Sequence, residues 1–162
     1  GLVGVLKAAR PAVFVVIHTN HAGELTAPAR AAIGRLRAAG LALLSQTVLL
    51  RGVNDRVETL EALLRALIGL GVKPYYLHHC DLAKGTGHFR TTVAEGLKLV
   101  ETLRARISGI AMPAYVLDIP GGFGKVALNG SNITETAPGL WQVRDRTGRL
   151  HDYRDPERLA LD

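Results

Sequence analysis

The sequence has a single cysteine, Cys80, among its 162 residues. One cysteine forms no internal disulfide, and it cannot complete a thiolate-bound zinc or iron–sulfur site by itself. Aromatic residues are also scarce, since three Phe and one Trp offer few stacking platforms for single-stranded nucleic acid. The longest apolar stretches, such as LALLSQTVLL, are too short to span a bilayer, and the N-terminus shows no clear signal-peptide pattern. We therefore expect a cytoplasmic protein without a nucleic-acid or membrane partner.

Basic residues are in excess, and the formal net charge is +6. A basic chain could bind an anionic ligand or nucleic acid, but the arginines are dispersed along predicted helices, which is typical of solvated faces. Apolar residues make up 48% of the chain, enough for the core of one domain, and a piece of a larger domain would look the same. Because GLVGVLKAARPAVFVV lacks an initial Met and leads directly into a strand-like segment, we expect a fragment.

Apolar runs alternate with amphipathic segments over most of the chain. The runs predict buried strands over residues 13–18, 41–50, 72–80 and 115–119. Helices are predicted between them, with Thr26 able to cap the first and Thr92 and Glu95 forming a capping box for the third. Crossovers of this length favour parallel pairing, as in an α/β barrel or a doubly wound sheet. LWQVRDRTGRLHDYR then predicts an antiparallel hairpin that turns at residues 146–148.

Polar residues gather where each predicted strand ends. In parallel α/β folds the carboxyl ends of the strands form the active-site face, so this coincidence indicates an enzyme. The residues are His18, Asn20 and His21 after the first strand, Arg51, Asn54 and Asp55 after the second, His78, His79 and Asp81 after the third, and Asp118 and Lys125 after the fourth.

The histidines could suggest a metal site, because imidazoles at neighbouring strand ends converge in space. Polar contacts to a ligand or a loop are the better interpretation, since no recognisable ligand spacing is completed by an acidic residue or a cysteine. His78 and His79 are adjacent in a strand and should point to opposite sides of it. The histidines concerned are His18, His21, His78, His79 and His88.

Three further features stand out. Gln46 lies inside an apolar strand, where an amide needs buried partners or a ligand. GVND at residues 52–55 favours a turn with a helix cap. DLAKGTGHFR is a long loop that carries Asp81, His88 and Arg90 between two firm elements, which suits contact with a substrate.

The segment DIPGGFGK, residues 118–125, ends an apolar run with an aspartate, turns through glycines and places one lysine. It is not a P-loop, because the glycine spacing differs and Val126 follows Lys125 where a Ser or Thr is needed. Glycines allow the backbone to approach a flat or phosphorylated ligand closely, and a lysine held away from bulk water can react as an amine. On these grounds a Schiff-base lysine and an ordinary turn lysine both remain open.

The segments HTNHAGELT, SQTVLLRGVND, KPYYLHHCDLAKGTGHFR, SGIAMP and YVLDIPGGFGK follow one another without a break in order. Together they resemble the lysine 2,3-aminomutase family of radical S-adenosylmethionine enzymes. The resemblance implies an incomplete (β/α) barrel, with residues 1–128 supplying its later strands and helices and residues 129–162 forming a C-terminal extension with a small β-hairpin. It also implies the conversion of L-lysine to L-β-lysine by radical amino migration, in an enzyme that is a homo-oligomer when complete.

The resemblance also implies roles for individual residues. Lys125 would hold pyridoxal 5'-phosphate as a Schiff base. Asp81 and Asp118 would grip the distal ammonium of lysine, since two anions facing one cation favour a long basic amino acid. His18 and Gln46 would lie near S-adenosylmethionine, whose cleavage at a [4Fe–4S] cluster starts the reaction; the cofactors carry the difficult chemistry.

Two departures from the family pattern matter. The three-cysteine cluster motif CxxxCxxC is absent, and so is the cysteine-rich C-terminal metal site that some members carry. We therefore expect no metal site in this chain, and no activity from the chain alone. The alternatives are the branch of the family that makes β-lysine for elongation factor P, whose glycine-rich segment usually differs, a glutamate-specific member, and an inactive noncatalytic fragment.

Overall fold

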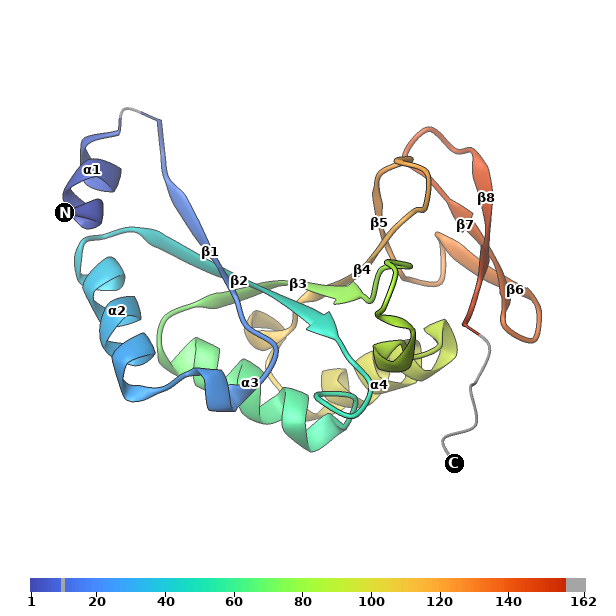
Figure 1. The fold of residues 1–162 in the computed structure, drawn as a ribbon, viewed down its shortest axis with the longest axis horizontal. Coiled ribbons are helices and arrows are strands. Elements are labelled where there is room, and N and C mark those ends of the chain that lie inside the picture. Colours follow the sequence, from blue (N-terminus) through green and yellow to red (C-terminus); the bar gives the residue numbers. More distant parts are fainter. Residues whose placement is uncertain (10, 157–162) are drawn as a thin grey trace.

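The computed structural model describes residues 1–9 and 11–156, and its main feature is a five-stranded sheet (Figure 1). The strands lie side by side in chain order. The first four are parallel, and β5 runs antiparallel beside β4. Their bounds are β1 Phe14–His18, β2 Ala42–Leu49, β3 Lys73–His79, β4 Ala114–Asp118 and β5 Lys125–Ala127. The four predicted parallel strands are confirmed, each to within one residue at either end, whereas β5 was not predicted.

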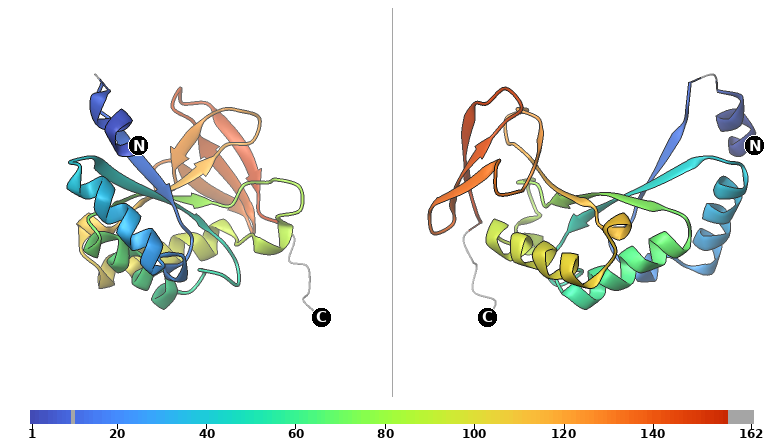
Figure 2. Two further views of the ribbon diagram at one scale, coloured as in Figure 1. Left: turned by 60° about the vertical axis from the view of Figure 1, so that its left-hand side comes forward. Right: turned by 180° about the vertical axis from the view of Figure 1, so that it is seen from behind.

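Helices α2, α3 and α4 all lie against one face of this sheet (Figures 1 and 2). The capping box of α4 is confirmed, because Thr92 Oγ1 accepts from Glu95 N at 3.2 Å and Glu95 Oε2 accepts from Thr92 N at 2.7 Å. Thr26 lies at the N-cap of α2, but among the described residues its side chain caps no backbone N–H. Within the described part of the chain, no helix has both the length and the apolar character needed to cross a bilayer. The helices are α1 Leu2–Ala8, α2 Ala27–Ala38, α3 Val57–Gly69 and α4 Val93–Arg106, with short 3-10 turns η1 Ala22–Glu24, η2 Gly87–Phe89 and η3 Gly109–Ala111.

The period-two alternation of the strands separates two faces of the sheet. In β2, residues 43, 45, 47 and 49 are buried, whereas residues 44, 46 and 48 are partly exposed. We call the face turned away from the helices the open face. It is formed by Val16 and His18 of β1, Leu44, Gln46 and Val48 of β2, Tyr76 and His78 of β3, Asp118 of β4 and Lys125 of β5.

The apolar core lies on the helix side of the sheet and has two clusters. One cluster packs β2 against α2 and α3, with Leu43, Ile33 and Leu63 buried in it. The larger cluster includes residues of α3, α4, β3 and β4. At its centre Tyr115 passes over Gly96 of α4, where a Cβ atom would overlap the Tyr115 hydroxyl. The glycine therefore lets this helix approach the sheet closely.

A second, antiparallel sheet follows the first in the chain. It contains β6 Ile133–Ala137, β7 Leu140–Arg144 and β8 Leu150–Arg154, in that order (Figure 1). The predicted hairpin is confirmed as β7 and β8, and β6 is an addition that was not predicted. Trp141, Val143 and Tyr153 of this sheet are buried in the larger core cluster. A mixed α/β fold with a small β extension is thus what the structure shows.

Candidate functional site

Three side chains of the open face meet where β3, β4 and β5 lie side by side. Asp118 and Lys125 are register partners in the antiparallel β4–β5 pair, and so their side chains point to the same face. Lys125 Nζ lies 2.5 Å from Asp118 Oδ2 and 3.2 Å from His78 Nδ1. His78 Nδ1 is also 3.3 Å from Asp118 Oδ2. We call His78, Asp118 and Lys125 the lysine cluster.

The lysine cluster is partly shielded from water. The side chain of His78 is 15% exposed, that of Lys125 29% and that of Asp118 40%. Burial alone would raise the pKa of Asp118, but hydrogen bonds and charge from Lys125 and His78 lower it below its ordinary value. The pKa of His78 is lowered by burial and by the Lys125 cation. At neutral pH the carboxyl group of Asp118 is therefore ionised, and the imidazole of His78 beside it is neutral.

Tyr76 lies beneath the ammonium of Lys125, whose Nζ is 5.5 Å from the centroid of the Tyr76 ring. This distance is typical of a cation–π contact. Tyr76 is two residues before His78 in β3, so both point to the open face. Tyr76 was not among the predicted site residues, because an aromatic residue in a strand is usually a core residue. The period-two pattern of β3 could have identified Tyr76, because it places Tyr76 on the same face of the strand as His78.

A glycine-rich turn leads from Asp118 to Lys125. Gly121, Gly122 and Gly124 have φ of 91°, 82° and 94°, in the region that favours glycine. The turn is held at its tip by Phe123, whose ring packs on His151 of β8 with centroids 4.4 Å apart. DIPGGFGK therefore forms a fixed turn against the second sheet, with its lysine directed to the open face.

Asp81 and Asp118 line one pocket of about 490 Å³. The pocket lies between the loop after β3 and the glycine-rich turn, and residues of both segments line it. Arg90 fixes the loop, because its Nε donates to the carbonyl of Asp81 at 3.0 Å and its Nη2 to the carbonyl of Ala83 at 2.6 Å. Two carboxylates thus border a cavity of the size that small-molecule sites commonly have.

His18 and Gln46 lie farther along the open face. They are register partners in the parallel β1–β2 pair, and Gln46 is in turn the register partner of Tyr76. His18 is exposed and Gln46 is half-buried. The predicted site residues therefore form two groups. Asp81 and Asp118 line the pocket and Lys125 contacts Asp118, whereas His18 and Gln46 lie nearer β1.

Comparisons with known proteins match the sequence of this chain to one family. A family model described as lysine-2,3-aminomutase matches residues 100–162. A protein named putative L-lysine 2,3-aminomutase from Aquifex aeolicus is 40% identical over 152 residues, which are 94% of this chain and 41% of that protein. The L-lysine 2,3-aminomutase of Fusobacterium nucleatum is 39% identical over 156 residues, 96% of this chain and 36% of that protein. The chain belongs to the lysine 2,3-aminomutase family.

Relatives that are named for different substrates have similar identity to this chain. A glutamate 2,3-aminomutase from Clostridioides difficile is 40% identical over 150 residues, 93% of this chain and 35% of that protein. The chain spans about two fifths of the length of the curated relatives it matches. Overall identity therefore places the chain in the family without separating lysine from glutamate.

Several polar residues at the strand ends have structural roles in this family member. Asn54 Oδ1 accepts from Leu50 N, and Asn54 Nδ2 donates to the carbonyls of Asn20 and Val48, each at 2.7 or 2.8 Å. GVND is therefore a turn, as predicted, although the N-cap of α3 is Arg56. His21 caps η1 by accepting from Gly23 N at 3.0 Å.

The histidines do not converge on one point. His21 is bound within its own turn, and the ring of His88 packs on Phe89 with centroids 3.9 Å apart. His79 points to the helix side, opposite to His78, as the alternation predicted. Among residues 1–9 and 11–156, no group of three or more His, Cys, Asp or Glu is placed to hold a metal ion.

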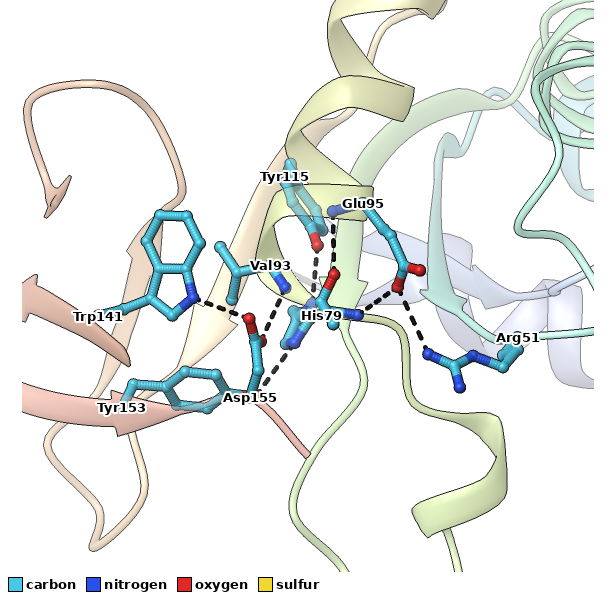
Figure 3. Close-up of polar contacts among 9 residues, drawn as sticks. Arg51, His79, Val93, Glu95, Tyr115, Trp141, Tyr153 and Asp155 are labelled. Atoms are coloured by element: carbon cyan, nitrogen blue, oxygen red, sulfur yellow. Dashed lines mark hydrogen bonds and ion pairs between the residues drawn. The ribbon is translucent and has the colours of Figure 1, made fainter. Parts of the chain in front are cut away.

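A buried hydrogen-bond network joins the two sheets (Figure 3). His79 Nδ1 pairs with the Tyr115 hydroxyl at 2.7 Å, and its Nε2 with the Tyr153 hydroxyl at 3.1 Å. Nearby, Asp155 accepts from Trp141 Nε1 and from Val93 N, each at 2.8 Å. We call these residues, His79, Val93, Tyr115, Trp141, Tyr153 and Asp155, the buried network. This network could not be predicted from the sequence, because its partners are up to 74 residues apart.

Proposed function

We propose that this chain supplies the cofactor lysine and the substrate-ammonium carboxylates of a lysine 2,3-aminomutase. The observation that supports this most directly is the lysine cluster: Lys125 Nζ lies 2.5 Å from Asp118, and Asp118 lines one pocket together with Asp81. Two carboxylates that line one cavity, with an amine in contact with one of them, suit a reaction on a basic amino acid. In this reading L-lysine is converted to L-β-lysine.

The residues around Lys125 fit pyridoxal 5'-phosphate. A cavity of about 490 Å³ is large enough for this cofactor together with part of an amino acid. Gly122 and Gly124 line it, and a Cβ built on either would meet open space, so the backbone of the turn is free to approach a flat ring. When bound, pyridoxal 5'-phosphate supplies a carbonyl carbon for an amine and a conjugated ring that can delocalise an unpaired electron.

Asp118 already binds an ammonium in this structure, that of Lys125. Once the amine of Lys125 is engaged by the cofactor, this carboxylate loses its cation and is available to the distal ammonium of lysine. Asp81 faces the same pocket and would provide the second anion. The pairing of a substrate ammonium with two carboxylates in a partly dry pocket would exclude a glutamate side chain by like-charge repulsion. This argument favours lysine over glutamate.

His18 and Gln46 form a second polar site on the open face, and we assign to them contact with S-adenosylmethionine. The [4Fe–4S] cluster does not fit these residues. Cys80 is the only cysteine in the sequence, it is buried, and burial raises the pKa of its thiol. We further propose that residues 1–128 are part of a (β/α) barrel whose inner face is the open face, and that residues 129–162 form the extension.

Binding of pyridoxal 5'-phosphate tests this proposal. We expect an absorbance band near the visible edge that disappears on borohydride reduction, and we expect Lys125→Ala to abolish it. Lys98→Ala, an exposed position on α4, is the matched control and should bind as the unmodified chain does. Equal bands in both variants would rule out Lys125 as the cofactor lysine.

Substrate choice needs a second variant. In an enzyme that contains the radical-generating part, Asp118→Asn should raise the KM for L-lysine by at least about tenfold, because a neutral amide cannot balance a buried ammonium. Pyridoxal 5'-phosphate binding should change much less. Unchanged lysine kinetics would contradict the assignment of Asp118.

A further inference from the structure

His78 has no part in the function proposed above, although it contacts both other members of the lysine cluster. Its Nδ1 is 3.2 Å from Lys125 Nζ and 3.3 Å from Asp118 Oδ2. A lysine ammonium cannot attack a carbonyl, so Lys125 must first lose a proton. The nearest carboxylate is a poor acceptor, because its charged form is already stabilised by two neighbours.

We infer that His78 is the base that accepts this proton, and that it thereby frees the amine of Lys125 for the cofactor's carbonyl carbon. This inference rests on the proposed cofactor role of Lys125. In the step an N–H bond of Lys125 breaks and an Nδ1–H bond forms on His78; no electrons are transferred. Before and after, the cluster holds one cation and the Asp118 anion, so no net charge is created in a partly buried site.

Charges on every side of His78 are consistent with this role. Lys125 lies on β5, Asp118 on β4, and Asp81 follows β3; Tyr76 of the same strand packs edge-to-face on the imidazole with centroids 5.6 Å apart. While Lys125 is an ammonium, burial and that cation lower the pKa of His78, so the imidazole is neutral and one of its ring nitrogens is unprotonated. After the transfer Lys125 is neutral, and the imidazolium lies beside two carboxylates. The transfer itself removes the Lys125 cation, which is one of the two causes that lower the pKa of His78.

The second ring nitrogen is consistent with Nδ1 as the accepting atom. His78 Nε2 is buried and has no hydrogen-bond partner among the described residues. A neutral imidazole whose Nδ1 accepts carries its proton on Nε2, so the same Nε2–H is unpaired before and after the transfer. Only Nδ1, which lies beside Lys125, changes its protonation in the step.

The test compares the unmodified protein with His78→Asn and His78→Ala. Asparagine places an amide near the position of Nδ1, so it keeps a hydrogen bond to Lys125 but accepts no proton. Attachment of pyridoxal 5'-phosphate to Lys125 is followed from pH 6 to 9 by borohydride quenching and mass spectrometry. We expect attachment at pH 7 to be at least about tenfold slower in both variants. We expect added imidazole to restore the rate in His78→Ala only.

A cofactor-independent probe separates this inference from the proposed function. Acetic anhydride acetylates free amines, and the exposed Lys84 provides an internal reference in the same molecule. If pyridoxal 5'-phosphate does not select Lys125 but its acetylation relative to Lys84 falls at least several-fold in His78→Asn, the proposed function fails and the role of His78 stands. If both reactions of Lys125 have the same rate and pH dependence in His78→Asn as in the unmodified protein, His78 only makes a hydrogen bond and the inference is overturned.

Discussion

His78 and His79 are consecutive residues of one strand, and the molecule uses them in opposite ways. His78 lies on the open face, in contact with Lys125 and Asp118. His79 lies on the helix side, only 1% exposed, and its two ring nitrogens pair with the hydroxyls of Tyr115 and Tyr153. The pleat of a strand thus separates the imidazole that we propose as a base from one that has a structural role. We propose that the lysine cluster carries the chemistry, whereas the buried network joins the two sheets.

The largest expected difference comes from removing each imidazole in turn. His79→Ala leaves two buried hydroxyls without their partner and opens a cavity, so we expect a loss of about 4 kcal/mol in the free energy of unfolding. His78→Ala leaves the Lys125–Asp118 pair intact and should cost about 1 kcal/mol or less. Urea denaturation of both variants measures the difference. Equal losses of unfolding free energy in the two variants would show that His78 and His79 contribute equally to stability, and would contradict the comparison.

The pH dependence of stability provides the next test. Burial lowers the pKa of His79 to about 4, compared with 6.5 for an ordinary histidine. The unfolded chain therefore binds a proton between pH 6.5 and 4 that the folded protein does not, and stability falls as the pH decreases through this window, by about 3 kcal/mol. The lowered pKa of His78 acts in the same direction, whereas the raised pKa of Asp155 opposes it near pH 4.

His79→Gln isolates this effect, because glutamine has no proton to gain in that range. The difference in unfolding free energy between pH 7 and pH 4.5, measured by urea denaturation, should be smaller in the variant. A variant with the same pH dependence as the unmodified protein would show that His79 titrates freely and is not held neutral by burial.

Asp155 tests the other half of the buried network. Its carboxylate accepts from Trp141 Nε1 and from Val93 N, so Asp155→Asn turns one acceptor into a donor that faces a donor. We expect a loss of about 2 kcal/mol. Asp152→Asn on the exposed side of β8 is the matched control and should change stability by less than about 0.5 kcal/mol. Thermal unfolding of both variants measures the difference. Similar decreases in Tm would show that Asp155 has no structural role.

The smallest expected effect concerns the turn that carries Lys125. Gly122 has φ of 82° with open space around it, so Gly122→Ala should cost about 1 kcal/mol through backbone strain alone. The same exchange at Gly34, inside α2 and also in open space, should increase stability by up to about 1 kcal/mol. Changes of opposite sign in the unfolding free energy of the two variants, measured by urea denaturation, would support the turn geometry. An increase in stability for Gly122→Ala would contradict it.

The sequence predicted the regular elements well, because long apolar runs and helix caps are local signals. The capping box at Thr92 and the opposite orientations of His78 and His79 follow from such signals, and both are confirmed. The sequence could not predict β5, which has three residues and exists only through its pairing with β4. It also could not predict the roles of Asp155 or Tyr76, because these depend on partners brought together by the tertiary fold. The cofactor role proposed for Lys125 became specific only through a family resemblance.

Peptide mapping after borohydride reduction with pyridoxal 5'-phosphate tests the central claim most directly, namely that the open face carries the chemistry through Lys125. The sequence offers five lysines, at positions 7, 73, 84, 98 and 125. We predict that the reduced cofactor is found on the peptide containing Lys125, and that L-lysine added before reduction lowers this labelling by drawing the cofactor to itself. Label spread evenly over the other four lysines, with no preference for Lys125, would contradict the account.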